Sequence, residues 1–403
     1  MDLIRHSARR DLRVDFFRGL ALWWIFTDHI PGDLLSNVSL RNFAMCDATE
    51  IFVLLAGYGA GLSYGKRLHT HGFVSSAADV LKRAWTLYVA HIFLFVLFSA
   101  QVSYSATALN RLSYLEESRL DVLGDDPYRS ILEAVFLRFQ PSLLNILPLY
   151  VVLLVLFAAT IWLLRWPHIL FGLSFATYLL VQITHVNLNE WTGEGWFFDP
   201  FAWQFLFVLG VLMACAPPRM PRRKWPYDIL AIFVVVIGLI TAYVIEPQPH
   251  ILDWFSASWL RFLVIEDKTG LHPFRLASIL SLTWLAVRLI PPHAAWLRTR
   301  WASVLVLLGQ HSLPVFCAGI VLGFVARLGL EFNDRAAMQV AINLFGAVGM
   351  TAVGGLAAWY RVKDRASHAK ERVTERSAER LVERRVVEQH DSRLPQAVQP
   401  DTG

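Results

Sequence analysis

Apolar residues occur in long, nearly uninterrupted runs along most of the chain, and short polar segments separate one run from the next. Most runs contain about 17 to 25 residues, the length that a helix needs to cross a hydrocarbon core of about 30 Å. The pattern predicts an all-α, polytopic integral membrane bundle of about ten transmembrane helices. The predicted spans are residues 14–34, 47–65, 79–101, 143–164, 167–185, 198–215, 226–245, 274–291, 302–328 and 337–360.

Basic residues between the spans predict the orientation of the bundle. Clusters of Arg and Lys lie before the first span and after the second, sixth and eighth spans, which is one side of the membrane if the spans number ten. The positive-inside rule makes this side cytoplasmic, so we expect a bacterial inner-membrane protein with both termini in the cytoplasm. The opposite loops, 102–142 and 186–197, are rich in Asp and Glu.

Two segments depart from the pattern. Residues 251–266 are apolar but contain Asp253 and Arg261, and counting them as a span would move the later basic residues to the outside, so we expect an amphipathic or re-entrant segment. In the tail, Glu and Arg recur at a spacing of four, which is typical of a solvated helix. We therefore predict a transmembrane domain over 1–360 and a charged cytoplasmic tail over 361–403, helical and then disordered.

Composition excludes a soluble fold and offers no sign of a metal centre. Of the 403 residues, 55% are hydrophobic and 17% are charged, which is too apolar for a soluble domain of this length. The three cysteines are far apart and form no cluster with histidine, so we expect neither a disulfide framework nor a metal site. The expected partner is the lipid bilayer, with no nucleic acid and no permanently bound cofactor.

The first span holds the densest set of ionisable residues, and each of these is costly in a bilayer. His29 follows Arg18 by eleven positions, which at about 100° per residue is three turns with about 20° left over. The two side chains therefore share one face of the helix. Their levels differ by about 16 Å, with Arg18 near the cytoplasmic boundary and His29 deep toward the other side.

This arrangement suits acyl transfer from a cytoplasmic thioester. A guanidinium near the inner surface can hold the phosphates of an acyl-CoA through paired hydrogen bonds. A deep imidazole can take the proton of an acceptor hydroxyl or carry the acyl group itself. The alternatives are that Arg18 snorkels to the headgroups and that His29 is merely hydrogen-bonded inside the bundle.

Other polar residues inside or beside the spans are candidates for the same site. Glu50 is a possible carboxylate partner for the imidazole, although a structural role at the start of its helix explains it as well. The remaining candidates for substrate binding are Asp28, Asp47, Lys268, Gln310, His311 and Ser312. Polar packing between helices accounts for the last three about equally well.

Several segments resemble the OpgC family, and the resemblance covers residues 11 to about 360. It is carried by RVDFFRGLALWWIFTDHIP (13–31), DATEIFVLLAGYGAGLSYG (47–65), NILPLYVVLL (145–154), FFDPFAWQFLFVLG (197–210), DKTGLHPFRL (267–276) and LGQHSLPVFC (308–317). The resemblance implies a ten-helix protein of the transmembrane acyltransferase superfamily. It also implies the activity named for the OpgC family, the O-succinylation of osmoregulated periplasmic glucans from a cytoplasmic acyl donor.

Further residue roles follow from this resemblance. The acyltransferase-3 superfamily is similar in having Arg-x10-His on the first helix, which corresponds to Arg18 and His29. Its Arg-x-x-Arg on the third helix is not present here, and Lys82 and Arg83 are the nearest basic pair for donor phosphates. A succinyl carboxylate would want an extra cation near His29, and Lys268 or Arg275 can supply it.

The sequence thus predicts a membrane O-acyltransferase that moves an acyl group, succinyl or acetyl, from acyl-CoA to a hydroxyl of a periplasmic glucan or other envelope carbohydrate. One alternative is a transporter or flippase of a polar solute, with Arg18 and His29 in its path. A second alternative is a structural membrane scaffold.

Overall fold

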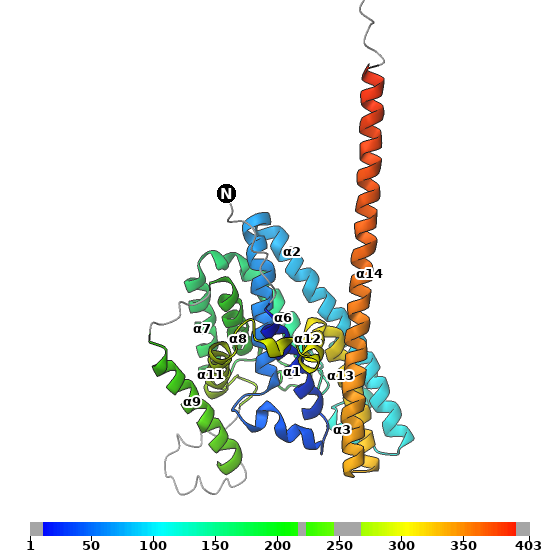
Figure 1. Cartoon of the computed structure of the whole chain (residues 1–403). Helices are drawn as coiled ribbons and strands as arrows, with labels where there is room; N and C mark the ends of the chain where they lie inside the picture. Colours follow the sequence, from blue (N-terminus) through cyan, green and yellow to red (C-terminus); the bar gives the residue numbers. More distant parts are fainter. Residues whose placement is uncertain (1–10, 217–222, 246–266, 392–403) are drawn as a thin grey trace, which may run out of the picture. The chain divides into compact units, whose positions relative to one another are not determined.

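The computed structural model describes residues 11–216, 223–245 and 267–391, and these residues are largely helical (Figure 1). The long helices are α1 (Leu12–Asp28), α2 (Ala48–Ala108), α6 (Ile146–Thr160), α7 (Pro167–Thr184), α8 (Pro200–Cys215), α9 (Trp225–Ile240), α11 (Pro273–Leu289), α12 (Arg300–Gln310), α13 (Ser312–Phe332) and α14 (Ala336–Asp391). The shorter elements are η1 (Leu34–Val38), η2 (Leu40–Asn42), α3 (Ser113–Glu117), α4 (Val122–Asp125), α5 (Pro127–Val135), η3 (Ile161–Arg165), η4 (Thr241–Ile245) and η6 (Ala295–Arg298). No strand is present in the described ranges.

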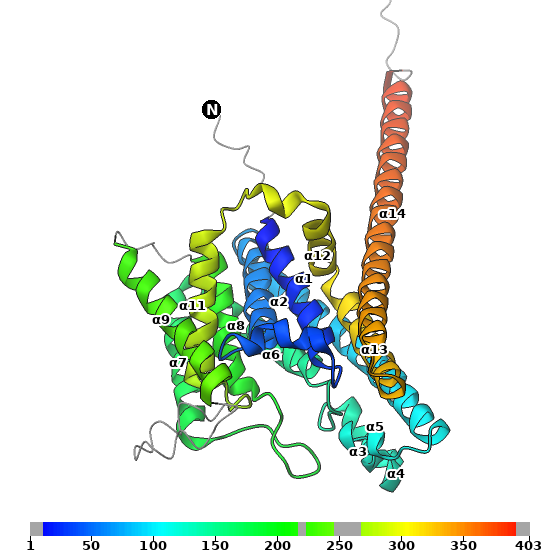
Figure 2. The same cartoon turned by 60° about the horizontal axis from the view of Figure 1, so that its bottom comes forward.

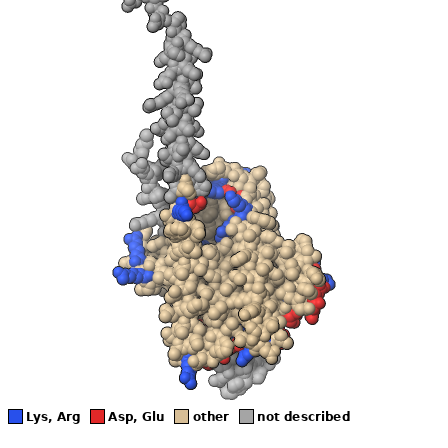
Figure 3. Space-filling view, turned by 90° about the vertical axis from the view of Figure 1, so that its right-hand side faces the viewer, with Lys and Arg blue, Asp and Glu red and all other residues tan. Residues whose placement is uncertain are grey.

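The apolar helices make this a multi-pass membrane protein. Six of the described helices are long and apolar enough to cross a bilayer: Ala48–Ala108, Ile146–Arg165, Pro167–Thr184, Trp225–Tyr243, Ser312–Phe332 and Ala336–Asp364. Large apolar side chains such as Phe93 and Ile183 are exposed on these helices, as lipid contact requires. Figure 3 shows a broad uncharged face with Lys, Arg, Asp and Glu gathered toward its margins.

The predicted count of about ten spans is not confirmed, because several predicted spans form helices shorter than a typical hydrocarbon core. The first predicted span, 14–34, is helical only to Asp28, because Pro31 and Gly32 (φ 81°) turn the chain. With 17 residues, α1 and α11 are each about 25 Å long, shorter than a typical hydrocarbon core. With 16 residues, α8 is shorter still.

Two predicted boundaries are corrected by the structure. The second and third predicted spans belong to one helical element, α2, which bends at Gly72, where φ is 77° and ψ is −178°. The predicted span 302–328 is instead broken at His311 into α12 and α13. Pro314 lies in the first turn of α13, where a missing N–H is tolerated. The predicted segment 251–266 lies outside the described residues, and so do the side chains of the Glu and Arg rows in the tail.

Residues 1–354 and 355–403 form two compact units, and α14 runs through both. In the first unit, α1 packs against α2, α12 and α13, while α2 packs against α6 and α8 (Figure 2). Helix α7 covers α8, and α9 covers α11. The candidate residues of α1 are therefore surrounded by α2, α12 and α13.

Glycine allows the two tightest helix contacts. A Cβ atom placed on Gly19 of α1 would lie 1.9 Å from the carbonyl oxygen of Leu305 in α12. One placed on Gly57 of α2 would lie 2.0 Å from the carbonyl oxygen of Phe207 in α8. These backbones approach closely because no side chain intervenes, as at membrane helix interfaces rich in small residues. The contacts fix α1 and α2, which carry most of the candidate site.

Candidate active site

His29 stands at the C-terminal end of α1, and the turn that follows it is held by α14. The C-cap of α1 is His29 itself, and its backbone N–H donates to the carbonyl of Thr27. Beyond it, Gln339 Nε2 donates to the Gly32 carbonyl at 2.9 Å, and Asn343 Nδ2 donates to Asp33 Oδ1 at 2.8 Å. Side chains of α14 therefore hold the turn that follows His29.

The protonation pattern of the His29 ring follows from its partner. The Nδ1 atom lies in hydrogen-bond contact with the backbone carbonyl of Ile25, one turn earlier in α1. Because a carbonyl oxygen can only accept, Nδ1 carries the hydrogen, which leaves the lone pair of a neutral ring on Nε2. Nε2 makes no hydrogen bond to another described residue. An imidazole in this tautomer can act as a general base through Nε2.

Four charged side chains form a closed cluster at the start of α2 and the start of α11. Lys268 Nζ lies 2.6 Å from Asp47 Oδ2, and Arg275 Nη2 lies 3.1 Å from the same oxygen. Arg275 Nε donates to Glu50 Oε1 at 2.7 Å. His29 lies within electrostatic range of Lys268 and Asp47. The cluster holds two cations and two carboxylates, so its formal charge is balanced.

Asp47 and Glu50 also begin helix α2. The Asp47 side chain accepts from the backbone N–H of Glu50, and Glu50 Oε2 accepts from the Asp47 N–H at 2.8 Å, which together form a capping box. Asp47 also accepts from the Thr49 N–H at 2.7 Å. The structural role that the sequence allowed for Glu50 is thus confirmed. Both of its carboxylate oxygens are engaged, and neither is bonded to His29, so its catalytic role stays a prediction.

Lys268 projects from a turn that several helices hold in place. The carbonyls of Lys268 and Thr269 each accept from the indole N–H of Trp203 in α8 at 3.1 Å. The Gly270 and Leu271 carbonyls accept from side chains of α7, Gln182 at 2.6 Å and Tyr178 at 2.9 Å. At the end of the turn, burial lowers the pKa of His272, so a neutral ring caps α11.

Asp28, the neighbour of His29, has a different partner. Arg41 Nε lies 3.6 Å from Asp28 Oδ1, which joins the end of α1 to η2. The side chain of Asp28 is largely buried, while half of Arg41 is exposed. The predicted roles of Asp28, Asp47 and Lys268 in substrate binding stay predictions.

Arg18 lies between α1 and α2. Its Nη2 atom donates to the carbonyl of Leu55 at 2.7 Å. A Cβ atom at Gly59 would be 3.2 Å from the same nitrogen, so the missing side chain at Gly59 makes room for the guanidinium. The side chain of Arg18 therefore points toward α2. His29 interacts electrostatically with Asp47, which is the N-cap of the same helix.

Gln310, His311 and Ser312 are not beside His29. Gln310 Nε2 donates to Asp15 Oδ2 at 3.3 Å, one turn before Arg18 in α1. His311 is buried at the break between α12 and α13, and Ser312 begins α13. The structure therefore places this group at the Arg18 end of α1, and its predicted role in substrate binding stays a prediction.

Lys82 and Arg83 lie in the second half of α2, beyond the bend at Gly72. Lys82 is exposed and Arg83 is half-buried. Neither side chain forms an ion pair within the described ranges. A contact between this pair and the donor stays a prediction.

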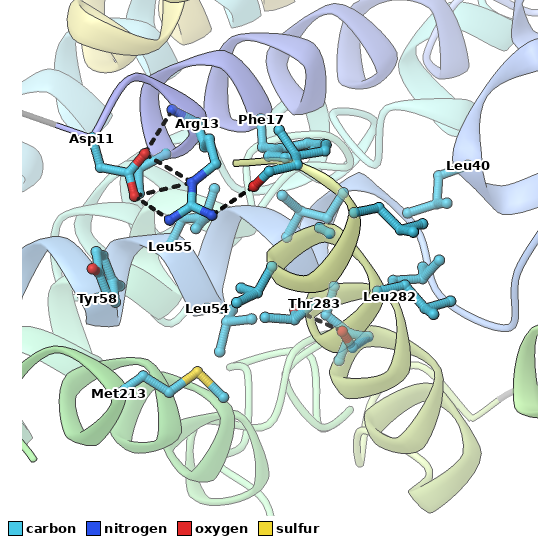
Figure 4. A pocket seen from close by; sticks show the side chains of 18 of the residues that line it. Asp11, Arg13, Phe17, Leu40, Leu54, Leu55, Tyr58, Met213, Leu282 and Thr283 are labelled. Carbon is cyan, nitrogen blue, oxygen red and sulfur yellow. Dashed lines mark hydrogen bonds and ion pairs between the residues drawn. The ribbon is translucent and has the colours of Figure 1, made fainter. Parts of the chain in front are cut away.

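A cavity of about 450 Å³ lies between α1, α2, α8 and α11. Figure 4 shows the ion pair of Asp11 and Arg13 at its edge, with side chains such as Leu54, Leu282 and Met213 around an apolar space. Arg13 Nη1 also donates to the Ile290 carbonyl at the end of α11 at 2.9 Å. None of the predicted site residues lines this cavity, so the cavity is separate from the cluster of Asp47, Glu50, Lys268 and Arg275.

The sequence alone does not reveal the roles of two residues near the site. It suggests Arg275 only as a source of positive charge, whereas in the structure Arg275 is the buried centre of the cluster and joins α2 to α11. Arg41 falls in a loop that the span pattern treats as featureless. An arginine inside a predicted span is costly unless it is paired. If its own helix offers no acidic residue three or four positions away, the arginine signals a partner on another element.

Comparison with protein families identifies the family of this chain. A family model described as OpgC protein matches residues 10–362. The chain belongs to the OpgC family. Members of the OpgC family are membrane acyltransferases that take part in glucan modification, and the predicted family resemblance is therefore confirmed. No curated protein and no solved structure gives a match.

Proposed function

We propose that this OpgC protein transfers an acyl group, succinyl in the first instance, from a cytoplasmic acyl-CoA to a hydroxyl of a periplasmic glucan. His29 is the general base, and Arg18 binds the donor. The observation that carries the proposal is the hydrogen bond from His29 Nδ1 to the Ile25 carbonyl, beside a charged cluster in a membrane protein of this family.

The reaction needs one proton acceptor and one leaving thiolate. His29 Nε2 takes the proton of the acceptor hydroxyl as its oxygen attacks the thioester carbonyl carbon. The tetrahedral intermediate then breaks its C–S bond, which releases the coenzyme A thiolate and leaves the new ester on the sugar. The imidazolium returns its proton to the thiolate, so the enzyme is unchanged after each turnover.

Arg18 is suited to the donor because a guanidinium binds phosphate through paired N–H groups. Its level on α1 is about 16 Å from that of His29, so an extended pantetheine arm would run between the two levels. We propose that the Arg18 end faces the cytoplasm and the His29 end faces the periplasm, as the loop charges predict. Lys82 and Arg83 are proposed as additional donor contacts.

A transfer assay on the purified protein in detergent tests this function. We expect release of coenzyme A thiol from acyl-CoA that depends on an added glucan, together with acylated glucan in the mass spectrum. A transporter or flippase would require a membrane gradient and would leave the thioester intact. Absence of acceptor-dependent thiol release from active, folded protein would contradict the proposal.

A further inference from the structure

Lys268 is the more accessible of the two cations in the charged cluster, whereas Arg41, which is 50% exposed, pairs with Asp28 outside it. The side chain of Lys268 is 28% exposed, whereas that of Arg275 is 5% exposed. An ammonium group has three N–H donors, and Asp47 is the carboxylate that pairs with it among the described residues. Donor capacity therefore remains on Lys268 for a further anion.

Lys268 can take a further anion while it stays in the cluster. Asp47 Oδ2 is shared between Lys268 at 2.6 Å and Arg275 at 3.1 Å, and Arg275 also holds Glu50. Departure of Lys268 would leave one cation for two carboxylates, so its contact with Asp47 is favoured. The remaining N–H groups of the ammonium can donate to a carboxylate without breaking that contact.

The surroundings of Lys268 favour a small anionic group. Its Nζ atom lies 5.6 Å from the ring centre of Phe198 and 6.0 Å from that of Phe197. Aromatic faces attract the ammonium and keep water away from it, which strengthens its interaction with an anion. The backbone of its turn is fixed by α7 and α8, so the ammonium is presented from a rigid support.

We propose that Lys268 binds the free carboxylate of a dicarboxylic acyl group and thereby selects succinyl over acetyl. This inference rests on the proposed function, because it needs the thioester carbonyl beside His29. The carboxylate of a succinyl group is two methylene groups from that carbonyl. Lys268 is held at the N-cap of α2 by Asp47, and its charge acts on His29, so we place the succinyl carboxylate at this end of the cluster.

Competition between donors tests the inference. Purified protein receives a glucan acceptor and equal concentrations of succinyl-CoA and acetyl-CoA, and the mass spectrum gives the ratio of succinylated to acetylated product. We expect the wild type to favour succinyl and Lys268→Met to lower the ratio about tenfold or more, the effect of losing one charge-assisted hydrogen bond. Acetyl transfer should be largely retained, since acetyl has no carboxylate.

Two further variants separate substrate recognition from a structural role. Lys268→Arg keeps the charge and should restore much of the preference for succinyl. Lys66→Met removes an exposed lysine of α2, distant from the cluster, and should leave the ratio unchanged. Size-exclusion profiles and thermal unfolding identify any variant that fails to fold.

The possible results fall into distinct groups. Equal loss of both products in folded Lys268→Met, an unchanged ratio, or a wild type that favours acetyl would each overturn the role of Lys268 and leave the proposed acyltransferase intact. A wild type that transfers neither group would overturn the proposed function, and the role of Lys268 with it.

Discussion

The two ends of α1 differ in how their polar groups are bonded. At the His29 end, Asp47, Glu50, Lys268 and Arg275 satisfy one another within 3.1 Å. At the Arg18 end, the guanidinium binds a backbone carbonyl, and an apolar cavity lies nearby. The difference indicates that the His29 end is preorganised for chemistry. The Arg18 end is the proposed binding site for the donor phosphates.

The largest expected effect concerns the stability of the His29 end. Arg275→Met would leave Glu50 buried without its cation, at a cost of about 3–5 kcal/mol in the free energy of unfolding. Thermal unfolding in detergent measures this loss. Arg67→Met breaks an exposed ion pair with Asp79 and should cost at most about 1 kcal/mol. If both variants unfolded at the same temperature, the buried cluster would not stabilise the helix ends.

The next effect concerns packing at the Arg18 end. Gly19→Ala places a methyl group 1.9 Å from the Leu305 carbonyl oxygen, so α1 and α12 must separate. We expect destabilisation of about 1–3 kcal/mol, the range for overpacked sites. The matched change Gly172→Ala meets open space in α7 and should be neutral or slightly stabilising. Equal unfolding temperatures for the two variants would contradict a close contact between α1 and α12.

A kinetic difference should distinguish the two ends. Arg18→Ala removes the proposed phosphate contact, so the KM for acyl-CoA should rise on the order of tenfold, while the KM for the glucan stays constant. Arg18→Lys should give an intermediate value, because lysine lacks the planar fork. Arg165→Ala, an exposed arginine beyond α6, is the control. A rise in the KM for the glucan instead of the KM for acyl-CoA would contradict the assignment of Arg18 to the donor.

The smallest effect is expected at Lys82 and Arg83. Their joint replacement by Met should raise the donor KM several-fold at low salt, and the effect should shrink at high salt because exposed charges are screened. Lys224→Met removes another exposed basic residue, at the start of α9, and serves as the control. Equal effects of the two changes would mean that only the overall positive charge matters.

Much of the fold could be predicted from apolar length, but helix ends could not. Pro31 and Gly32 stop α1, although the apolar residues around them extend the hydropathy signal to residue 34. A helix break lies at His311, between Gln310 and Ser312, although the apolar residues on both sides average to one long span. Hydropathy averages over a window, whereas a break depends on the backbone of one or two residues.

In the candidate site, too, local features could be predicted from the sequence and long-range contacts could not. The spacing of Arg18 and His29 predicts a shared helix face, because helical periodicity is local. The pairing of Glu50 with Arg275 joins residues 225 positions apart, and helix packing alone brings them together. The family resemblance suggests Lys268 or Arg275 as a cation near His29, but only the fold shows that the two share Asp47.

The most direct test of the central claim is the acylation of periplasmic glucans in cells that produce His29→Ala. In the proposed mechanism His29 is the base, so mass spectrometry should show glucans without acyl substituents, although the variant protein is present in the membrane at the wild-type level. His168→Ala, a change at an exposed histidine of α7, should leave the substituents unchanged. Undiminished acyl substitution in His29→Ala would contradict the assignment of His29 as the catalytic base.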